Sequence, residues 1–166
     1  MLIFQLTQPH RSKTIFEFEG KLYTFNVFAQ GEKDYDKNFD VFTKWLDSNN
    51  MDFDTWKNIH TKQTLNYVKK TLMYFEEQGI NTNILTWPDE YIEHILNDSW
   101  LKKRFIRFYY NDIMFNSLNS LMLLPEMTIR TDVGNLSNPP IDEHPSLKCH
   151  QVIAKSIIKK LENTII

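Results

Sequence analysis

The sequence predicts an α/β protein, a three-layer α/β/α sandwich in which helices cover both faces of a mostly parallel sheet. Two observations favour this class. Short apolar runs that end at turn residues alternate along the chain with segments whose apolar residues recur at helical spacing. The chain has 166 residues, 42% of them hydrophobic, which is enough to bury one core. We therefore expect a single domain over residues 1–166, with strands joined by helical crossovers.

The N-terminal part is predicted to contain a strand and then a β-hairpin. Residues 2–6 are mostly apolar and are closed by Thr7-Gln8-Pro9, as in a short buried strand. Residues 14–19 and 21–28 alternate between polar and apolar side chains around Gly20, which favours a hairpin. Because its outward positions are polar, the segment 13–28 is expected to be a surface insertion.

Two helices are predicted next. Apolar residues at helical spacing indicate the first of them: Tyr35, Phe39, Phe42 and Leu46. The second helix is longer, with Asp52 as its expected N-cap and Gly79 as its expected C-cap. Its apolar face is expected to contain Phe53, Trp56, Ile59, Val68, Leu72 and Phe75.

The alternation continues through the middle of the chain. Residues 80–87 predict a second strand, and Pro88 favours the start of a short helix. Residues 105–110 fit either a strand or a helix, whereas residues 116–124 favour a helix that ends before Pro125.

The C-terminal part is predicted to hold a third strand and a final helix. Residues 127–130 read as the strand, and the helix is expected to begin at Pro145. Three lysines are expected to face outward near its C-terminal end, where cations are favoured: Lys155, Lys159 and Lys160.

Composition excludes several classes of function. A formal net charge of −2 makes nucleic acid an unlikely partner on general electrostatic grounds. The one cysteine, Cys149, allows no intrachain disulfide. No signal peptide or membrane-spanning run is present in the sequence, so we expect no membrane association and a cytoplasmic protein. His60, Glu93 and His94 match no metal-ligand spacing, and we expect neither a metal nor a cofactor.

A candidate catalytic pair lies directly before the final helix. Asp142 and His144 are two residues apart, a compact way to hold a general base and the carboxylate that orients it. The same residues also fit a plain loop with Pro145 at the first helical position. His150 falls on a different helical face from His144, so a capping or packing role is expected for it.

This block resembles the C-terminal block of the SGNH hydrolases, also called GDSL-type esterases. The residues that carry the resemblance are Asp142-Glu143-His144-Pro145-Ser146, followed by His150, Ile153 and Ala154. It implies a flavodoxin-like sandwich in which Asp142 and His144 complete a triad with a serine. The Gly-Asp-Ser turn, the first strand and the first helix have no counterpart here. Gln5, near the end of the first predicted strand, is the candidate for an oxyanion-hole amide.

The resemblance thus implies the C-terminal portion of an SGNH-like esterase or acyl hydrolase, inactive alone because it lacks a nucleophile. Its substrate would be an ester or an acylated carbohydrate, and a partner polypeptide would supply the missing block. If the domain begins at its central strand, the open edge of residues 2–6 also predicts self-association.

Two alternatives remain open on the sequence. The chain could be a non-catalytic binding or interaction domain that uses aromatic-rich surfaces or the open sheet edge. It could also bind nucleic acid through residues 102–110, which mix basic and aromatic side chains. The acidic balance of the chain argues against this last hypothesis and favours core aromatics beside a solvated basic edge.

Overall fold

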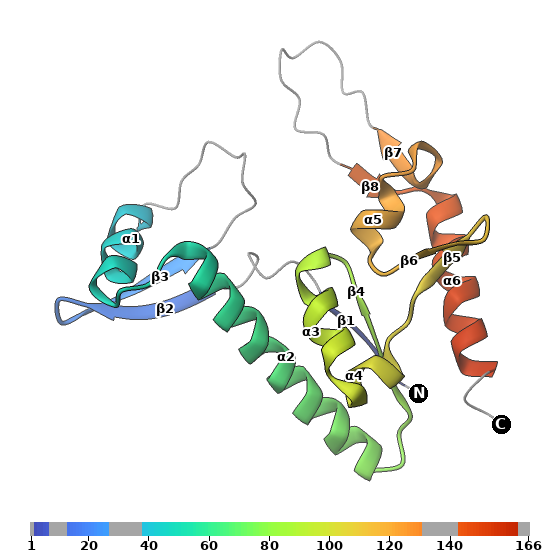
Figure 1. Cartoon of the computed structure of the whole chain (residues 1–166), viewed down its shortest axis with the longest axis horizontal. Coiled ribbons are helices and arrows are strands. Elements are labelled where there is room, and N and C mark those ends of the chain that lie inside the picture. Colours follow the sequence, from blue (N-terminus) through green and yellow to red (C-terminus); the bar gives the residue numbers. More distant parts are fainter. Residues whose placement is uncertain (1, 7–12, 27–37, 131–142, 163–166) are drawn as a thin grey trace. The chain divides into compact units, whose positions relative to one another are not determined.

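A computed structural model describes residues 2–6, 13–26, 38–130 and 143–162, which belong to two compact units (Figure 1). The first is formed by Met1–Leu6 together with Phe75–Ile166, and we call it the sheet unit. The second, Thr7–Tyr74, lies between these two parts in the sequence, and we call it the insertion unit. The predicted hairpin segment is therefore part of a larger insertion that also contains helices.

The insertion unit begins with the predicted β-hairpin. Strand β2 (Lys13–Phe18) pairs antiparallel with β3 (Lys21–Asn26). Glu19 and Gly20 form the two-residue turn, and both have positive φ, 49° and 73°. Such turns match the twist of the paired strands, and glycine adopts positive φ without steric cost. Helix α1 (Phe39–Ser48) follows, as the spacing of its apolar residues predicts.

An aromatic core holds the insertion unit together. Phe42 of α1 is fully buried, and its ring stacks on Phe25 with centroids 4.1 Å apart. The ring of Trp56 meets Phe42 edge-on at 5.0 Å. Because strand residues alternate, the hairpin buries Phe25 on one face while Ile15 remains 71% exposed on the other. The core cluster consists of Phe16, Phe25, Phe42, Leu46 and Trp56.

Helix α2 (Phe53–Glu77) starts in the insertion unit, and its last turn belongs to the sheet unit. Asp52 caps its N-terminus, since the Thr55 N–H donates to Asp52 Oδ1 at 2.6 Å and lowers the pKa of that carboxyl. Gly79, with φ 77°, ends it. The Ile80 N–H donates to the Phe75 carbonyl at 3.0 Å, which closes a Schellman motif. Both predicted caps are confirmed.

The sheet unit is built around a small parallel sheet. β1 (Leu2–Leu6) pairs in parallel with β4 (Thr82–Thr86), in register from Leu2 opposite Thr82 to Leu6 opposite Thr86. Phe105 forms a parallel bridge to Ile84 on the other edge of β4. All of β4 is buried. The two predicted strands are confirmed, the second as the shorter Thr82–Thr86, and they form a parallel sheet.

The sheet is smaller than the sequence predicts. The segment that fits strand or helix forms β5 (Phe108–Tyr110), which pairs antiparallel with β6 (Ile113–Phe115) across a turn at Asn111 and Asp112. The predicted third strand is β7 (Thr128–Arg130), and it pairs antiparallel with β8 (Glu143–Pro145) instead of joining the parallel sheet. The protein is therefore a mixed α/β protein with a small parallel sheet.

Short helices complete the sheet unit. A 3-10 turn, η2 (Asp89–Tyr91), leads from Pro88 into α3 (Ile92–Asn97), as predicted. After α4 (Ser99–Arg104) and the two short strands come α5 (Leu118–Met122), η3 (Pro125–Met127) and finally α6 (Leu147–Glu162). None of the described helices is long and apolar enough to cross a membrane.

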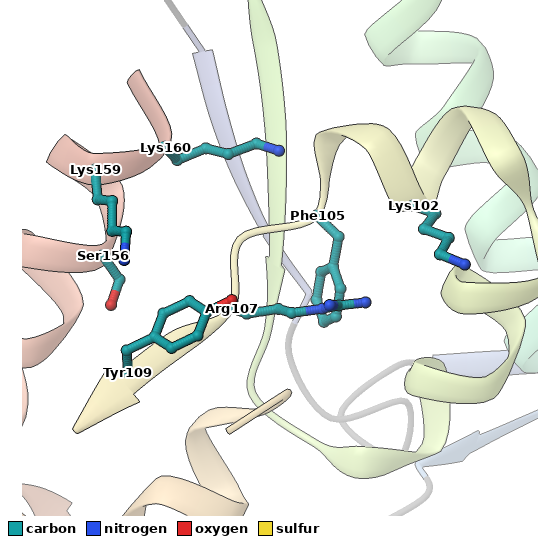
Figure 2. A pocket seen from close by; sticks show the side chains of 7 residues that line it. All are labelled: Lys102, Phe105, Arg107, Tyr109, Ser156, Lys159 and Lys160. Carbon is teal, nitrogen blue, oxygen red and sulfur yellow. The ribbon is translucent and has the colours of Figure 1, made fainter. Parts of the chain in front are cut away.

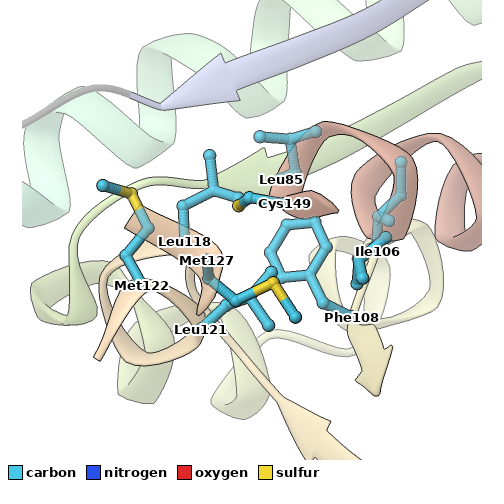
Figure 3. Packing of buried hydrophobic residues seen from close by; sticks show 9 residues of the cluster. Leu85, Ile106, Phe108, Leu118, Leu121, Met122, Met127 and Cys149 are labelled. Carbon is cyan, nitrogen blue, oxygen red and sulfur yellow. The ribbon is translucent and has the colours of Figure 1, made fainter. Parts of the chain in front are cut away.

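The core of the sheet unit lies between the strands and the helices α5 and α6 (Figure 3). Cys149 and Val152 of α6 pack in one cluster with Leu85 of β4 and with Phe108 of β5. The full set of buried residues is Leu85, Ile106, Phe108, Leu118, Leu121, Met122, Met127, Cys149 and Val152. Since side chains alternate along a strand, Asn83 lies on the same face of β4 as Leu85.

One edge of β1 remains open in the described part of the structure. β4 occupies the first edge, and among the described residues no second strand pairs with the other. Ile3 and Phe4 are half-buried. An unpaired strand edge is a template for pairing with another chain. Self-association through β1 therefore stays a prediction.

Candidate functional site

The structure does not test the predicted catalytic pair. Asp142 lies outside the described residues. His144 is in β8, where its backbone pairs with Ile129, and its side chain is outside the described part of the structure. Whether the two side chains meet therefore stays a prediction.

The backbone around His144 differs from the expected helical turn. Pro145 ends β8 opposite Thr128, and α6 begins at Leu147 instead of Pro145. Ser146 caps the helix: its hydroxyl accepts from the Cys149 N–H at 3.2 Å. The reason is that the Ser146 N–H is held by the Met127 carbonyl at 2.8 Å, which keeps the preceding residues extended.

Gln5, the oxyanion-hole candidate, lies in β1 opposite Leu85, with an exposed side chain. Its proposed role needs a nucleophile nearby and stays a prediction. The carboxyl end of β4, where α/β enzymes usually place their sites, is occupied by internal hydrogen bonds. Thr86 Oγ1 donates to the Pro88 carbonyl at 2.8 Å, and the fully buried Ser117 hydroxyl bonds Asp89 and caps α5.

A cleft between α4, the segment that leads into β5, and α6 is lined by positively charged side chains (Figure 2). We call it the basic cleft. It has a volume of about 320 Å³. Four cationic side chains line it, and among the described residues no acid does. The lining residues are Lys102, Phe105, Arg107, Tyr109, Ser156, Lys159 and Lys160.

Local structure explains why these side chains meet. Ile106 and Phe108 are buried in the core, so strand alternation turns Arg107 and Tyr109 to the opposite side. On α6, Ser156 is buried on the face that packs against the core. Lys160 follows Ser156 by one helical turn, so it continues that face toward the cleft.

The cations are held close together. Lys159 Nζ lies 4.8 Å from the centroid of the Tyr109 ring, a cation–π contact. Lys160 is half-buried, and its Nζ donates to the Lys103 carbonyl at 2.6 Å. Burial lowers the pKa of Lys160, and the neighbouring positive charges, Arg107 first among them, lower it further. Proximity to other cations therefore disfavours the charged form of Lys160.

A second cleft shares Lys160 with the first, and we call it the amide cleft. It has a volume of about 670 Å³. Its residues come from the end of α2, the start of β4, the end of α4, and α6. They are Glu76, Gly79, Ile80, Asn81, Thr82, Asn83, Lys103, Arg104 and Lys160.

An ion pair forms one wall of the amide cleft. Arg104 Nε donates to Glu76 Oε1 at 2.5 Å, and Arg104 Nη2 bonds Glu76 Oε2. Thr82 Oγ1 donates to the same carboxylate at 2.6 Å, and the guanidinium lies 3.5 Å from the centroid of the Trp100 ring. The hydrogen bond from Arg104 is the main reason that the pKa of Glu76 is lowered. Arg104 is thus neutralised locally, whereas the described lining of the basic cleft contains no acid.

Asn83 is the unusual residue of the amide cleft. Its side chain is 2% exposed, and its Nδ2 has no hydrogen-bond partner among the described residues. A buried amide without a partner costs about 1–3 kcal/mol. Because Asn83 also lines the amide cleft, its unpartnered amide is a group there that an added acceptor would satisfy.

Sequence reasoning found only part of this site. The mixed run from Lys102 to Tyr110 is visible in the sequence, where it favours a solvated basic edge. Lys159 and Lys160 are predicted to face outward, but Lys160 is half-buried in the cleft wall. The burial of Lys160 could have been predicted from its position, because it extends the apolar row of α6 by one helical turn.

Comparisons and side-chain clusters add no further assignment. No family model matches the chain, and no curated protein or solved structure shows significant similarity to it. Within the described ranges, no group of three or more His, Cys, Asp or Glu side chains could hold a metal ion. The two clefts are therefore the candidate functional sites of the described residues.

Proposed function

We propose that the sheet unit is a non-catalytic binding domain that holds a phosphate-bearing ligand in the basic cleft. The observation that carries the proposal is the meeting of four cations with no acid among the described lining residues. They come from α4, from the residue directly before β5 and from α6, so tertiary folding brings them together.

The chemistry of the cleft favours phosphate. A phosphate group carries more charge than a carboxylate and presents three oxygens, so it can satisfy several donors at once. Arg107 offers a planar fork of donors, and the lysines offer flexible point charges. The cleft volume of about 320 Å³ is that of a small-molecule site. Burial is the main cause of the lowered pKa of Lys160, and a bound anion would offset the second cause, repulsion from the neighbouring cations.

Sodium tripolyphosphate, titrated into the full chain by isothermal calorimetry, tests the proposal. We expect saturable binding that weakens as salt is raised. Arg107→Gln should weaken binding about 10- to 100-fold, because it removes a charge-assisted contact. Lys155→Gln is the matched control, since Lys155 is exposed on α6 and lines neither cleft. Absence of binding, or an equal loss in both variants, would refute the proposal.

We also propose a more detailed description of the fold. A three-layer α/β/α sandwich of flavodoxin-like type is supported by the two covered sides of β4. Leu85 packs in one cluster with Cys149 of α6, and α4 contacts β4.

The esterase hypothesis makes a different prediction from the binding proposal. As a binding domain, the chain should hydrolyse short-chain p-nitrophenyl esters no faster than buffer, because ester hydrolysis requires an activated nucleophile and phosphate binding does not. Steady-state assays of ester hydrolysis test this. Hydrolysis that His144→Ala abolishes would favour the SGNH-like esterase instead.

A further inference from the structure

Lys160 lines both clefts, so a ligand bound at Lys160 can extend into either of them. The two clefts differ in chemistry. The basic cleft has only cations as its charged lining residues, whereas the amide cleft also contains the Glu76–Arg104 ion pair and neutral polar groups, among them the amide of Asn83 and the exposed Asn81. Its one acid, Glu76, is already bonded to Arg104 and Thr82.

The unpartnered Nδ2 of Asn83 indicates what the amide cleft lacks. A buried N–H donor without a partner is matched by an acceptor oxygen. Inorganic phosphate held by the basic cleft carries no neutral part that could extend past Lys160. A phosphate ester of a sugar does, because its hydroxyl and ring oxygens accept hydrogen bonds.

We propose that the ligand is a sugar phosphate, with its phosphate in the basic cleft and its sugar in the amide cleft, where a sugar oxygen accepts a hydrogen bond from Asn83 Nδ2. This inference rests on the proposed function, because it requires the basic cleft to hold the phosphate. Asn83 is then the residue that distinguishes a sugar phosphate from phosphate alone. Lys160 lies where the two parts of the ligand join.

Ribose 5-phosphate and inorganic phosphate, titrated into the full chain, separate the two proposals. We expect ribose 5-phosphate to bind about five- to tenfold more tightly than inorganic phosphate, the effect of one added hydrogen bond and new contacts. Asn83→Leu should remove most of that preference and leave the affinity for tripolyphosphate unchanged. Leucine has a similar shape and leaves no buried polar atom unpaired, so this variant should also melt at a higher temperature than the wild type.

A second measurement does not depend on the variant's folding. The side-chain NH₂ signals of Asn83 in a ¹⁵N-labelled sample should shift on addition of ribose 5-phosphate and stay in place with inorganic phosphate. If tripolyphosphate binds but both phosphates bind equally, or Asn83 signals do not respond to the sugar phosphate, the sugar-phosphate inference is wrong while the binding domain stands. If tripolyphosphate does not bind at all, both proposals fail. Equal binding of a single-stranded oligonucleotide and ribose 5-phosphate would also contradict a small-ligand site.

Discussion

Phe42→Ala is expected to lower the unfolding free energy of the insertion unit by about 3–5 kcal/mol, the usual cost of removing a fully buried phenylalanine. Phe42 is at the centre of the aromatic cluster, with ring contacts to Phe16, Phe25 and Trp56. Its loss leaves a cavity and removes several favourable ring pairs at once.

Urea unfolding, followed by tryptophan fluorescence, measures this loss through Trp45 and Trp56, which belong to the same cluster. Ile15→Ala is the control, since Ile15 is 71% exposed on the opposite face of the hairpin, and it should change stability by no more than about 0.5 kcal/mol. A loss below about 1 kcal/mol for Phe42→Ala would mean that the cluster is not the core of this unit.

Glu76→Gln is expected to destabilise the sheet unit by about 2 kcal/mol at pH 7. Breaking a fully buried ion pair costs about 3–5 kcal/mol and an exposed one at most about 1 kcal/mol. The side chains of Glu76 and Arg104 are 25% and 17% exposed, which places this pair between the two limits. Without the carboxylate, the positive charge of Arg104 would no longer be neutralised, and it would repel Lys103 and Lys160.

The effect of Glu76→Gln should depend on pH in a defined direction. Because the folded protein lowers the pKa of Glu76 from 4.5, the ion pair stabilises the fold above about pH 4.5 and loses this effect as the pH falls through the lowered pKa. The stability difference between wild type and variant should therefore shrink in acid. Glu77→Gln, an exposed neighbour with the same change in charge, is the control for urea melts at pH 7 and pH 3. A difference that does not vary with pH would rule out the ion pair as its source.

Local features of the fold were predictable because local residues cause them. Asp52 and Gly79 bound α2 as capping rules require, and Gly20 forms the hairpin turn. The parallel pairing of β1 with β4 also follows from pattern, since both are short apolar runs on either side of helical segments.

Features that depend on distant contacts were not predictable. Nothing near residues 127–130 indicates that this strand pairs with residues 143–145 instead of the parallel sheet. The run 105–110 was ambiguous because its structure depends on a bridge from Phe105 to Ile84 and a turn at Asn111. The basic cleft needs α6 to lie beside Arg107, and no local sequence pattern indicates this.

The order of the two units along the chain has a consequence for how the protein is made. β1 leaves the ribosome before its partner β4, which follows about 75 residues later. Closing a loop of that length costs conformational entropy before any pairing compensates. The β2–β3 hairpin, α1 and the start of α2 need only neighbouring residues and can fold during synthesis. The apolar β1 therefore remains unpaired while these elements fold. The sheet unit should therefore fold last and most slowly, after α6 has been synthesised.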